Sequence, residues 1–361
     1  MNRIGEITAR VKCAAQEAGF DLSGIAPAAS SPELDYFPAW IAAGHAGEMN
    51  YLEARDEQGD LKRSSLARVA PWARSVVVCA INYNTAQPYS TQFKDKSRGW
   101  ISRYAWGRED YHDAVLRRIR RVENRLKDIL HETGNAFGEL MTRSYVDTGP
   151  LVERVYAKYA GVGWIGKNTC IINQQKGSWL FLGVILTSVE LSPDLPAPDR
   201  CGTCTRCIEA CPTDAIIAPY RLDSNRCISY LTIEKRGEIP REFHAGIGNH
   251  IFGCDICQDV CPWNRKAPVT TAPEFSSRPE LINPALDWLA ELNAENFRRE
   301  FRGSPVRRTK LSGLRRNAAI AMGNSRNPNF LPVLEKLAAD ADPAVAESAR
   351  LAKEHLSKPG L

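Results

Sequence analysis

The sequence predicts a multidomain α+β protein, with a mixed α/β domain at residues 1–195, a cysteine-rich module at 196–270 and a helical domain at 280–361. Its 361 residues exceed what one compact core usually contains. In the N-terminal half, β-branched runs are interspersed with amphipathic helical patterns. Seven of the eleven cysteines fall in two short runs between residues 201 and 261, and helical periodicity dominates the C-terminal residues after about 284.

Five segments of the N-terminal domain have a clear pattern. Residues 1–20 and 110–132 place apolar residues at helical spacing between charged ones. Residues 75–83 (SVVVCAINY) and 177–191 (GSWLFLGVILTSVEL) are apolar runs typical of buried strands. A further strand is expected in GELMTRSYVDTGP, and it should end in a turn that begins at Asp147.

The C-terminal part is expected to be a helical repeat. A Pro- and Asp-rich linker (LSPDLPAPDRC, 191–201) precedes the cysteine-rich module, and the loop VTTAPEFSSRPEL comes after it. From about residue 284 a helix, a turn and a second helix are followed by Asp342-Pro343, which opens a third helix. This succession is typical of a HEAT-like repeat.

The sequence favours a cytoplasmic protein, and we expect it to be a monomer. No apolar run is long enough to span a membrane, and the N-terminus lacks the apolar core and cleavage site of a signal peptide. Structural disulfides are disfavoured in the cytoplasm, so clustered cysteines indicate metal or redox chemistry. The net charge of +5 is modest, but it permits a local basic surface for a polyanion.

The cysteine runs predict two 4Fe–4S clusters in a ferredoxin-like module. The spacing Cys201-x2-Cys204-x2-Cys207-x3-Cys211-Pro is that of bacterial two-cluster ferredoxins, in which the fourth cysteine binds the other cluster. The second run has three cysteines, and Cys227 supplies the eighth thiolate. The crossing rule assigns one cluster to Cys201, Cys204, Cys207 and Cys261, and the other to Cys254, Cys257, Cys211 and Cys227. A pair of zinc sites is the alternative.

Two other features have simpler interpretations. Cys13, Cys79 and Cys170 are expected to be small buried apolar residues. The stretch GVGWIGKN (161–168) contains G-x-G-x-x-G, but a nucleotide-binding motif needs a strand before it and a helix after it. Here a helical pattern precedes it and a strand and turn come after it, so its glycines are expected to form a turn or to let backbone approach a large ligand.

A series of distinctive motifs runs along nearly the whole chain. Besides both cysteine runs, it contains HAGEMNYL (45–52), RYAWGREDYHD (103–113), YVDTGPLVER (145–154), AGVGWIGKNT (160–169) and RCISYLTIE (226–234). This series resembles that of the epoxyqueuosine reductases, cobalamin-dependent iron–sulfur enzymes of queuosine tRNA modification that are related to reductive dehalogenases.

The resemblance implies a nitroreductase-like cobalamin-binding α/β domain, a ferredoxin-like module with two 4Fe–4S clusters and a C-terminal α-helical HEAT-like part that helps hold tRNA. The implied reaction is the last step of queuosine biosynthesis, the reduction of epoxyqueuosine to queuosine at the wobble position of a tRNA anticodon. An external low-potential donor would supply the electrons.

The resemblance also implies roles for individual residues. It places the proton donor at Asp147. It implies cofactor contacts by Arg63, Ser102, Asp147, Lys167 and Asn168, with Ser229 and Asp255 beside the clusters. To act as an acid near pH 7, Asp147 needs a pKa well above the ordinary value of about 3.9. The alternative is that Asp147, which precedes Thr-Gly-Pro, is an ordinary turn residue.

A basic run near the C-terminus is the candidate RNA-binding surface. Only Glu300 offsets the charge of Arg298, Arg299, Arg302, Arg307, Arg308, Lys310, Arg315 and Arg316. Such a run usually marks a solvated helix face, but a phosphate-binding role fits a tRNA substrate better.

Two other functions would use the same residues. Reductive dehalogenation of small organohalides needs the same cofactors, but it gives no reason for a basic helical tail. A module that only passes electrons to a partner gives no reason for a large N-terminal domain with a carboxyl-bearing turn.

Overall fold

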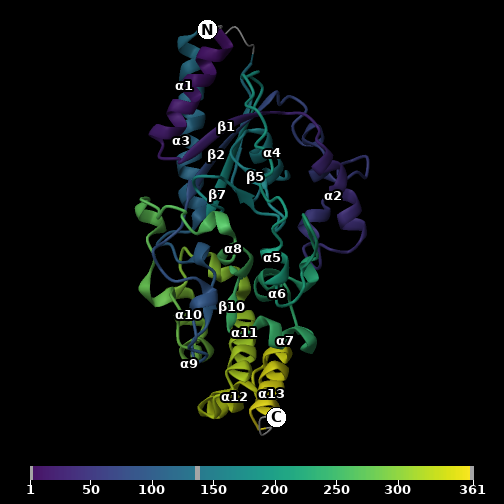
Figure 1. The fold of residues 1–361 in the computed structure, drawn as a ribbon, viewed down its shortest axis with the longest axis vertical. Coiled ribbons are helices and arrows are strands. Elements are labelled where there is room, and N and C mark those ends of the chain that lie inside the picture. Colours follow the sequence, from purple (N-terminus) through teal and green to yellow (C-terminus); the bar gives the residue numbers. More distant parts are fainter. Residues whose placement is uncertain (1–2, 135–138, 358–361) are drawn as a thin grey trace. The chain divides into compact units, whose positions relative to one another are not determined.

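The computed structural model describes residues 3–134 and 139–357, and the chain forms two compact units (Figure 1). The first unit contains residues 1–84, 111–204 and 262–272. The second contains residues 85–110, 205–261 and 273–361. The expected three-part division does not coincide with these units, since 85–110 belongs to the second unit and 262–272 to the first.

The first unit is built on a four-stranded sheet. Its order is β1-β2-β7-β4, with β1 at Leu22–Pro27, β2 at Ser75–Asn82, β7 at Leu180–Thr187 and β4 at Thr142–Tyr145. All neighbouring strands pair antiparallel. Every residue of β2 is buried, as its apolar run predicts. The strands expected at 75–83, at 177–191 and before Asp147 are confirmed.

Helices cover both faces of this sheet. The helices α1 (Arg3–Glu17) and α3 (Tyr111–Glu132) pack together, and α3 lies against β7. A Cβ atom on Gly183 of β7 would lie 2.6 Å from Ile119 of α3, so this close approach requires glycine. The short helix α4 (Glu153–Tyr159) packs on the other face, where Val155 contributes to a core with Val76 and Val78. The helix α2 spans Pro32–Ala42.

The glycine-rich stretch at 161–168 forms a tight hairpin. The helix α4 precedes it, and β5 (Trp164–Ile165) pairs antiparallel with β6 (Ile171–Ile172). A Cβ atom on Gly163 would lie 2.5 Å from the carbonyl oxygen of Ile172. These glycines therefore allow two backbone segments to approach each other. The expected order of elements around this stretch, with a helix before it and a strand after it, is confirmed.

The second unit is mainly helical. Its cysteine-rich part contains α5 (Arg206–Glu209), α6 (Ile228–Ile233), α7 (His244–Ile247) and α8 (Ile256–Asp259). Its strands are β3 (Trp100–Ile101) and β10 (His250–Phe252), which pair parallel, and β8 (Ile216–Ala218) and β9 (Arg221–Leu222), which pair antiparallel.

The expected C-terminal helices are confirmed. They are α9 (Leu286–Glu291), α10 (Ala294–Glu300), α11 (Lys310–Ser325), α12 (Leu331–Leu337) and α13 (Pro343–Ser357). The helix α11 packs against α13 and α9, and the shared core extends to Trp100 and Phe252. Within the described ranges, no helix is both long and apolar enough to cross a bilayer.

Candidate active site and iron–sulfur module

Asp147 lies in the turn between β4 and α4, in an unusual backbone conformation. Its φ is +58°, in the left-handed region that non-glycine residues seldom adopt. The amide of Thr148 donates to the carbonyl oxygen of Val146 at 2.7 Å, which tightens the turn. The Asp147 side chain is 66% exposed. The turn therefore presents a carboxyl group to solvent.

Two side chains from the start of α3 contact this carboxyl. The Tyr111 hydroxyl donates a hydrogen bond to Asp147 Oδ2 at 2.6 Å, and His112 Nε2 lies 3.6 Å from the same oxygen. The Tyr111 ring is stacked on Phe181 of β7 with a centroid distance of 4.4 Å. This stacking fixes the hydroxyl group beside the turn.

These contacts change the acidity of Asp147 in an unexpected direction. The interaction with His112, together with the hydrogen bond from Tyr111, lowers the pKa of Asp147 to about 2, although partial burial acts the other way. The prediction that Asp147 has a raised pKa, which an acid near pH 7 needs, is therefore wrong for the protein without substrate. In this state Asp147 is ionised at neutral pH.

The neighbouring Glu153 has the opposite shift. Burial and the charge of Asp147 raise the pKa of Glu153 to about 8. Its Oε1 atom accepts a hydrogen bond from the backbone N–H of Asp147 at 2.7 Å. Two carboxyl groups thus lie at one turn, and between about pH 2 and about pH 8 only Asp147 is charged.

Arg63, predicted to contact cobalamin, holds the same turn. Its guanidinium donates to the carbonyl oxygen of Gly149 at 3.0 Å and to that of Tyr51 at 2.6 Å. Burial lowers the pKa of Arg63. The guanidinium therefore links the turn to the loop around residue 51.

Lys167 and Asn168, also predicted to contact cobalamin, lie between β5 and β6. The Lys167 ammonium donates to the carbonyl oxygens of Gly202 at 2.6 Å and Cys204 at 3.0 Å. Asn168 is buried, and its side-chain oxygen accepts from the amide of Cys170 at 3.2 Å. Lys167 thus fixes the loop that carries the first cysteines of the module.

Several cysteines of the second unit are gathered together. The helices α5 and α8 pack against each other, and each carries the first cysteine of a Cys-x3-Cys-Pro sequence. Burial raises the pKa of the Cys254 thiol, and the nearby Cys227 and Cys211 raise it further. In the described part of the chain, no three Cys, His, Asp or Glu side chains are grouped to hold a single metal ion. Cys227 and Cys211 therefore lie near enough to Cys254 to interact with it electrostatically, but the three thiols are not gathered as closely as the ligands of a single metal ion.

Ser102 and Asp255, predicted separately, are in contact. The Ser102 hydroxyl donates to Asp255, which also accepts from the Trp100 indole at 3.0 Å and the Arg103 amide at 2.8 Å. Asp255 is 1% exposed. These hydrogen bonds fix the loop between Cys254 and Cys257.

Two further residues lie close to cluster cysteines in the sequence. Ser229 lies in the first turn of α6, just after Cys227. Asp259 lies in α8 and accepts hydrogen bonds from Ser90 and from the amide of Thr91. Burial and the charge of Asp255 raise the pKa of Asp259.

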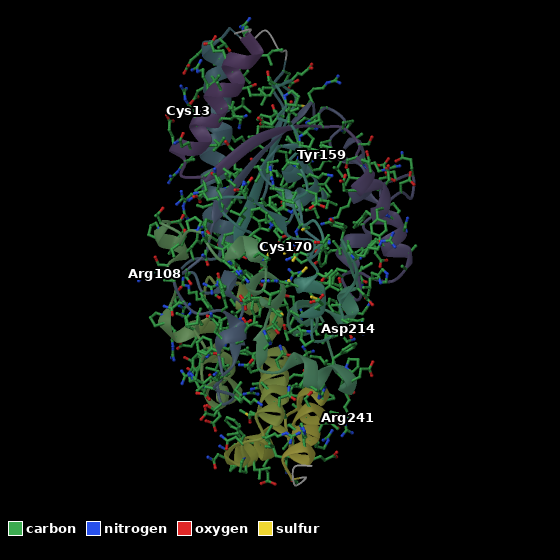
Figure 2. The ribbon with its side chains drawn as sticks, in the orientation of Figure 1. Cys13, Arg108, Tyr159, Cys170, Asp214 and Arg241 are labelled. Carbon is green, nitrogen blue, oxygen red and sulfur yellow. The ribbon has the colours of Figure 1, made fainter. Side chains whose placement is uncertain are left out.

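The three remaining cysteines differ in exposure. Cys79 is fully buried in β2, as expected. Cys13 is exposed on α1, so its predicted burial is wrong, and Cys170 is only partly buried (Figure 2). Cys13 lies on the exposed side of an amphipathic helix.

The basic run is not one surface. Arg316 is 2% exposed and donates to the carbonyl oxygens of Leu231, Lys235 and Gly237. Its prediction as an RNA-binding residue is wrong, because the guanidinium is buried in contacts that hold α11 against α6 and the segment after it. Arg315 pairs with Asp340 at 2.7 Å and is mostly covered, so it is a weak candidate.

The other basic residues of the run are exposed. Arg299 forms an ion pair with Glu300, and Arg308 forms one with Glu234. Four more side chains on α10, η11 (Pro305–Thr309) and the segments beside them complete the exposed set: Arg298, Arg302, Arg307 and Lys310. We call these four residues the α10–η11 basic surface.

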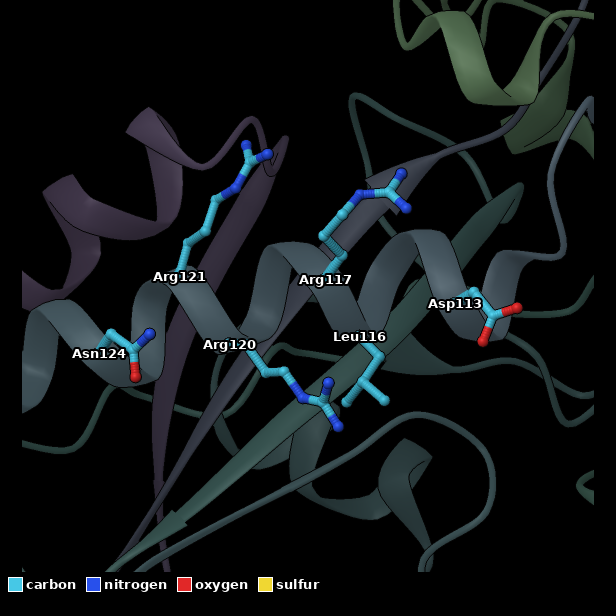
Figure 3. A pocket seen from close by; sticks show the side chains of 6 residues that line it. All are labelled: Asp113, Leu116, Arg117, Arg120, Arg121 and Asn124. Atoms are coloured by element: carbon cyan, nitrogen blue, oxygen red, sulfur yellow. The ribbon is translucent and has the colours of Figure 1, made fainter.

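A second basic surface lies on α3. A hollow of about 460 Å³ is lined by side chains from this helix alone (Figure 3): Asp113, Leu116, Arg117, Arg120, Arg121 and Asn124. The three arginines are exposed, and they occupy the side of α3 opposite its buried residues. The spacing of apolar residues predicts the helix α3, but it predicts no role for the positive charge on its outer face.

Three residues at the Asp147 turn were not singled out from the sequence. Tyr111 and His112 lie in RYAWGREDYHD, and Glu153 lies in YVDTGPLVER. Both motifs carry the family resemblance, which is a signal for these positions. Their contacts with Asp147 depend on folding, since Tyr111 is 36 residues away along the chain.

The fold and the cysteine module define a class of protein, an iron–sulfur oxidoreductase with an α/β domain that presents a carboxyl group. Residues 200–264 match the family model for a 4Fe–4S double cluster binding domain, and residues 63–148 match that for epoxyqueuosine reductase QueG. The chain is 39% identical over 354 residues to the epoxyqueuosine reductase of Xanthomonas campestris, covering 97% of this chain and 94% of that protein. The chain belongs to the epoxyqueuosine reductase family.

Other relatives agree with this assignment. The Vibrio cholerae epoxyqueuosine reductase is 39% identical over 333 residues, which cover 92% of this chain and 87% of that protein. An epoxyqueuosine reductase bound to an epoxyqueuosine-modified tRNA-Tyr stem loop is 30% identical, with a TM-score of 0.85 over 99% of this chain and 92% of that one. The Bacillus subtilis enzyme with its catalytic loop swung out of the active site is 29% identical, with a TM-score of 0.86 over the same shares.

Proposed function

We propose that this protein reduces epoxyqueuosine to queuosine at the wobble position of tRNA anticodons. The observation that carries this proposal is the exposed Asp147 carboxyl, which contacts Tyr111 and His112, at a turn whose backbone Glu153 holds. The chain is similar over nearly its whole length to an epoxyqueuosine reductase bound to a modified tRNA stem loop. An anticodon base leaves its stack readily, so it can reach a carboxyl group on a surface turn.

The reaction needs two electrons and two protons. They convert the epoxide into an alkene, and the oxygen leaves as water. When the carbon–oxygen bond breaks, the oxygen becomes an alkoxide that must take a proton, and Asp147 is the proposed donor. In the protein without substrate Asp147 is ionised. A nucleoside that covers this exposed side chain removes water from it, which favours the protonated form.

We propose cobalamin as the cofactor that meets the substrate. When bound, it supplies a cobalt centre able to transfer electrons to carbon, which no side chain can do. Among the buried polar atoms of the first unit for which no hydrogen bond is found within the described residues are Tyr156 Oη and Trp164 Nε1. Because such atoms are costly unless paired, they fit contacts to a bound group. Arg63, Ser102, Lys167 and Asn168 remain proposed contacts.

The 4Fe–4S clusters would pass electrons from an external low-potential donor. We retain the assignment of Cys201, Cys204, Cys207 and Cys261 to one cluster and Cys211, Cys227, Cys254 and Cys257 to the other. The proximity of three thiols of the second set supports it. We also propose that the C-terminal helices form a HEAT-like repeat and that the protein acts as a cytoplasmic monomer.

Conversion of the modified nucleoside tests the proposed function. Protein purified without oxygen should contain about eight iron atoms. With cobalamin and a low-potential reductant, it should remove one oxygen atom from epoxyqueuosine in tRNA, measured by mass spectrometry of the digested nucleosides. A parallel reaction without cobalamin should leave the epoxide unchanged. An intact epoxide with the fully reconstituted protein would overturn the function, and stoichiometric zinc in place of iron would overturn the clusters.

The α10–η11 basic surface is the proposed tRNA-binding site. Substitution of its four residues by alanine is expected to raise the Kd for tRNA about tenfold or more and to flatten its salt dependence, because each lost cation leaves a phosphate uncompensated. Filter binding at several salt concentrations measures both effects.

The arginines of α3 provide the matched comparison. The variant with Arg117, Arg120 and Arg121 replaced by alanine removes three exposed guanidinium groups from the other unit. Weaker binding in the α3 variant alone would place tRNA on α3 and would contradict the assignment to the α10–η11 basic surface.

A further inference from the structure

The proton-donor role of Asp147 does not account for Glu153. This residue begins α4, and its Oε1 atom accepts the backbone N–H of Asp147 at 2.7 Å. Glu153 is partly buried next to an ionised carboxylate. A second carboxyl group in such a place is unfavourable when it is charged. The hydrogen bond between Glu153 and the Asp147 amide must therefore serve a purpose that offsets this cost.

The backbone of the turn supplies that reason. A non-glycine residue in the left-handed region costs about 1 kcal/mol or more, so the surrounding structure must hold Asp147 there. Two side chains do so from opposite ends of the turn. Glu153 accepts the amide of Asp147, and Arg63 donates to the carbonyl oxygen of Gly149 at 3.0 Å.

We propose that Glu153 is a positioning residue, which fixes the backbone of Asp147 so that its carboxyl group is presented to the substrate. This inference rests on the proposed function, in which Asp147 donates the proton. In the Bacillus subtilis relative, the catalytic loop has been found swung out of the active site. A hydrogen bond to the backbone of such a loop is a contact that determines which position the loop occupies.

The charge of Glu153 decides whether this contact holds the turn without strain. The charged groups facing Glu153 are Asp147 in the turn, Arg154 on α4, His112 on α3 and Arg63 in η2 (Lys62–Ser64). Burial and Asp147 outweigh the cations and raise the pKa of Glu153 to about 8. Below this pH, Glu153 accepts the hydrogen bond as a neutral group. Above it, two carboxylates repel each other, and the Asp147 carboxyl is expected to be displaced.

Two substitutions separate the hydrogen bond from the charge. Glu153→Gln keeps an oxygen that accepts the Asp147 amide but cannot ionise. For the native enzyme we expect kcat to fall near pH 8. For Glu153→Gln we expect kcat within about threefold of the native value at pH 7, without that fall near pH 8. Glu153→Ala removes the acceptor, and we expect kcat to fall about tenfold or more with little change in KM for tRNA, because the turn is no longer held.

Two measurements without turnover test the same contact. Amide hydrogen exchange at Asp147 should be several times faster in Glu153→Ala and native-like in Glu153→Gln. The pKa of Glu153 is raised on folding, so the native protein should lose thermal stability relative to Glu153→Gln as pH rises from about 4.5 to about 8. These results remain informative if the protein proves inactive on epoxyqueuosine, which would overturn the proposed function alone.

Three outcomes would overturn the positioning role. One is native exchange at Asp147 in Glu153→Ala. Another is native kcat in that variant. The third is a Glu153→Gln enzyme whose kcat falls near pH 8 just as that of the native enzyme does, since the charge of Glu153 would then have no effect on the turn.

Discussion

Replacement of Asp147 by asparagine is expected to lower the rate of epoxide reduction by about 10²–10⁴-fold, the usual loss when a general acid is removed. Asparagine has nearly the same shape, and it tolerates the left-handed backbone that Asp147 adopts, where φ is +58°. Its side-chain oxygen can still accept the hydrogen bond from the Tyr111 hydroxyl. The change therefore removes the transferable proton and leaves the turn intact.

The measurement is a single-turnover rate with reduced, cobalamin-loaded protein. Iron content, cobalamin binding and tRNA affinity should match those of the native protein, which separates a chemical defect from misfolding. Asp214→Asn is the control, because Asp214 is also an exposed aspartate in the left-handed region, with φ of +49° and a side chain that is 83% exposed. Near-native turnover by Asp147→Asn would end the proton-donor role.

The sequence predicts those parts of the fold that local patterns determine. The strand β2 is an unbroken β-branched run, and α3 has apolar residues at helical spacing along its whole length, so both were expected at nearly their observed bounds. Cysteine spacing similarly predicts the iron–sulfur module, because the ligands of a cluster must lie at fixed separations. The division into two units could not be predicted, because each unit combines segments that are far apart along the chain. Residues 85–110 belong to the second unit, and residues 262–272 belong to the first.

The electrostatics of the candidate site could not be predicted either. A pKa depends on which groups surround a side chain, and the partners of Asp147 come from α3 and α4 as well as from its own turn. Asp147 was expected to be the residue with the raised pKa, but Glu153 has it. The two pKa values differ because the two side chains differ in burial and in the groups that they contact. Asp147 is exposed and accepts from Tyr111, whereas Glu153 is more buried and faces a negative charge.

The basic run illustrates the same limit for surfaces. Arg315 and Arg316 are adjacent to an otherwise exposed set, and no local pattern separates them from Arg307 and Arg308. The difference arises from tertiary contacts. The Arg316 guanidinium donates to carbonyl oxygens of residues that lie 79 to 85 positions earlier in the chain. An arginine can satisfy several acceptors in one plane, which makes it suitable for such a buried position.

Arg316→Met is therefore expected to destabilise the second unit by about 3 kcal/mol, with no specific loss of tRNA contacts. Methionine fills a similar volume, but the carbonyl oxygens of Leu231, Lys235 and Gly237 lose their donor, and each such loss costs about 1 kcal/mol or more. Removing the cost of burying a charge offsets part of this effect. Arg316→Lys should be intermediate, because one ammonium group cannot reach all three acceptors in the same geometry.

Urea unfolding monitored by far-UV circular dichroism measures this effect, with Arg307→Ala as the control. Arg307 is exposed, so its substitution should change stability by no more than about 0.5 kcal/mol while weakening tRNA binding. The two arginines should thus give opposite patterns, one affecting folding and the other affecting RNA. If Arg316→Met unfolded at the native urea concentration and bound tRNA weakly, the guanidinium would be an RNA contact, and the hydrogen bonds between α11 and the end of α6 would contribute little to stability.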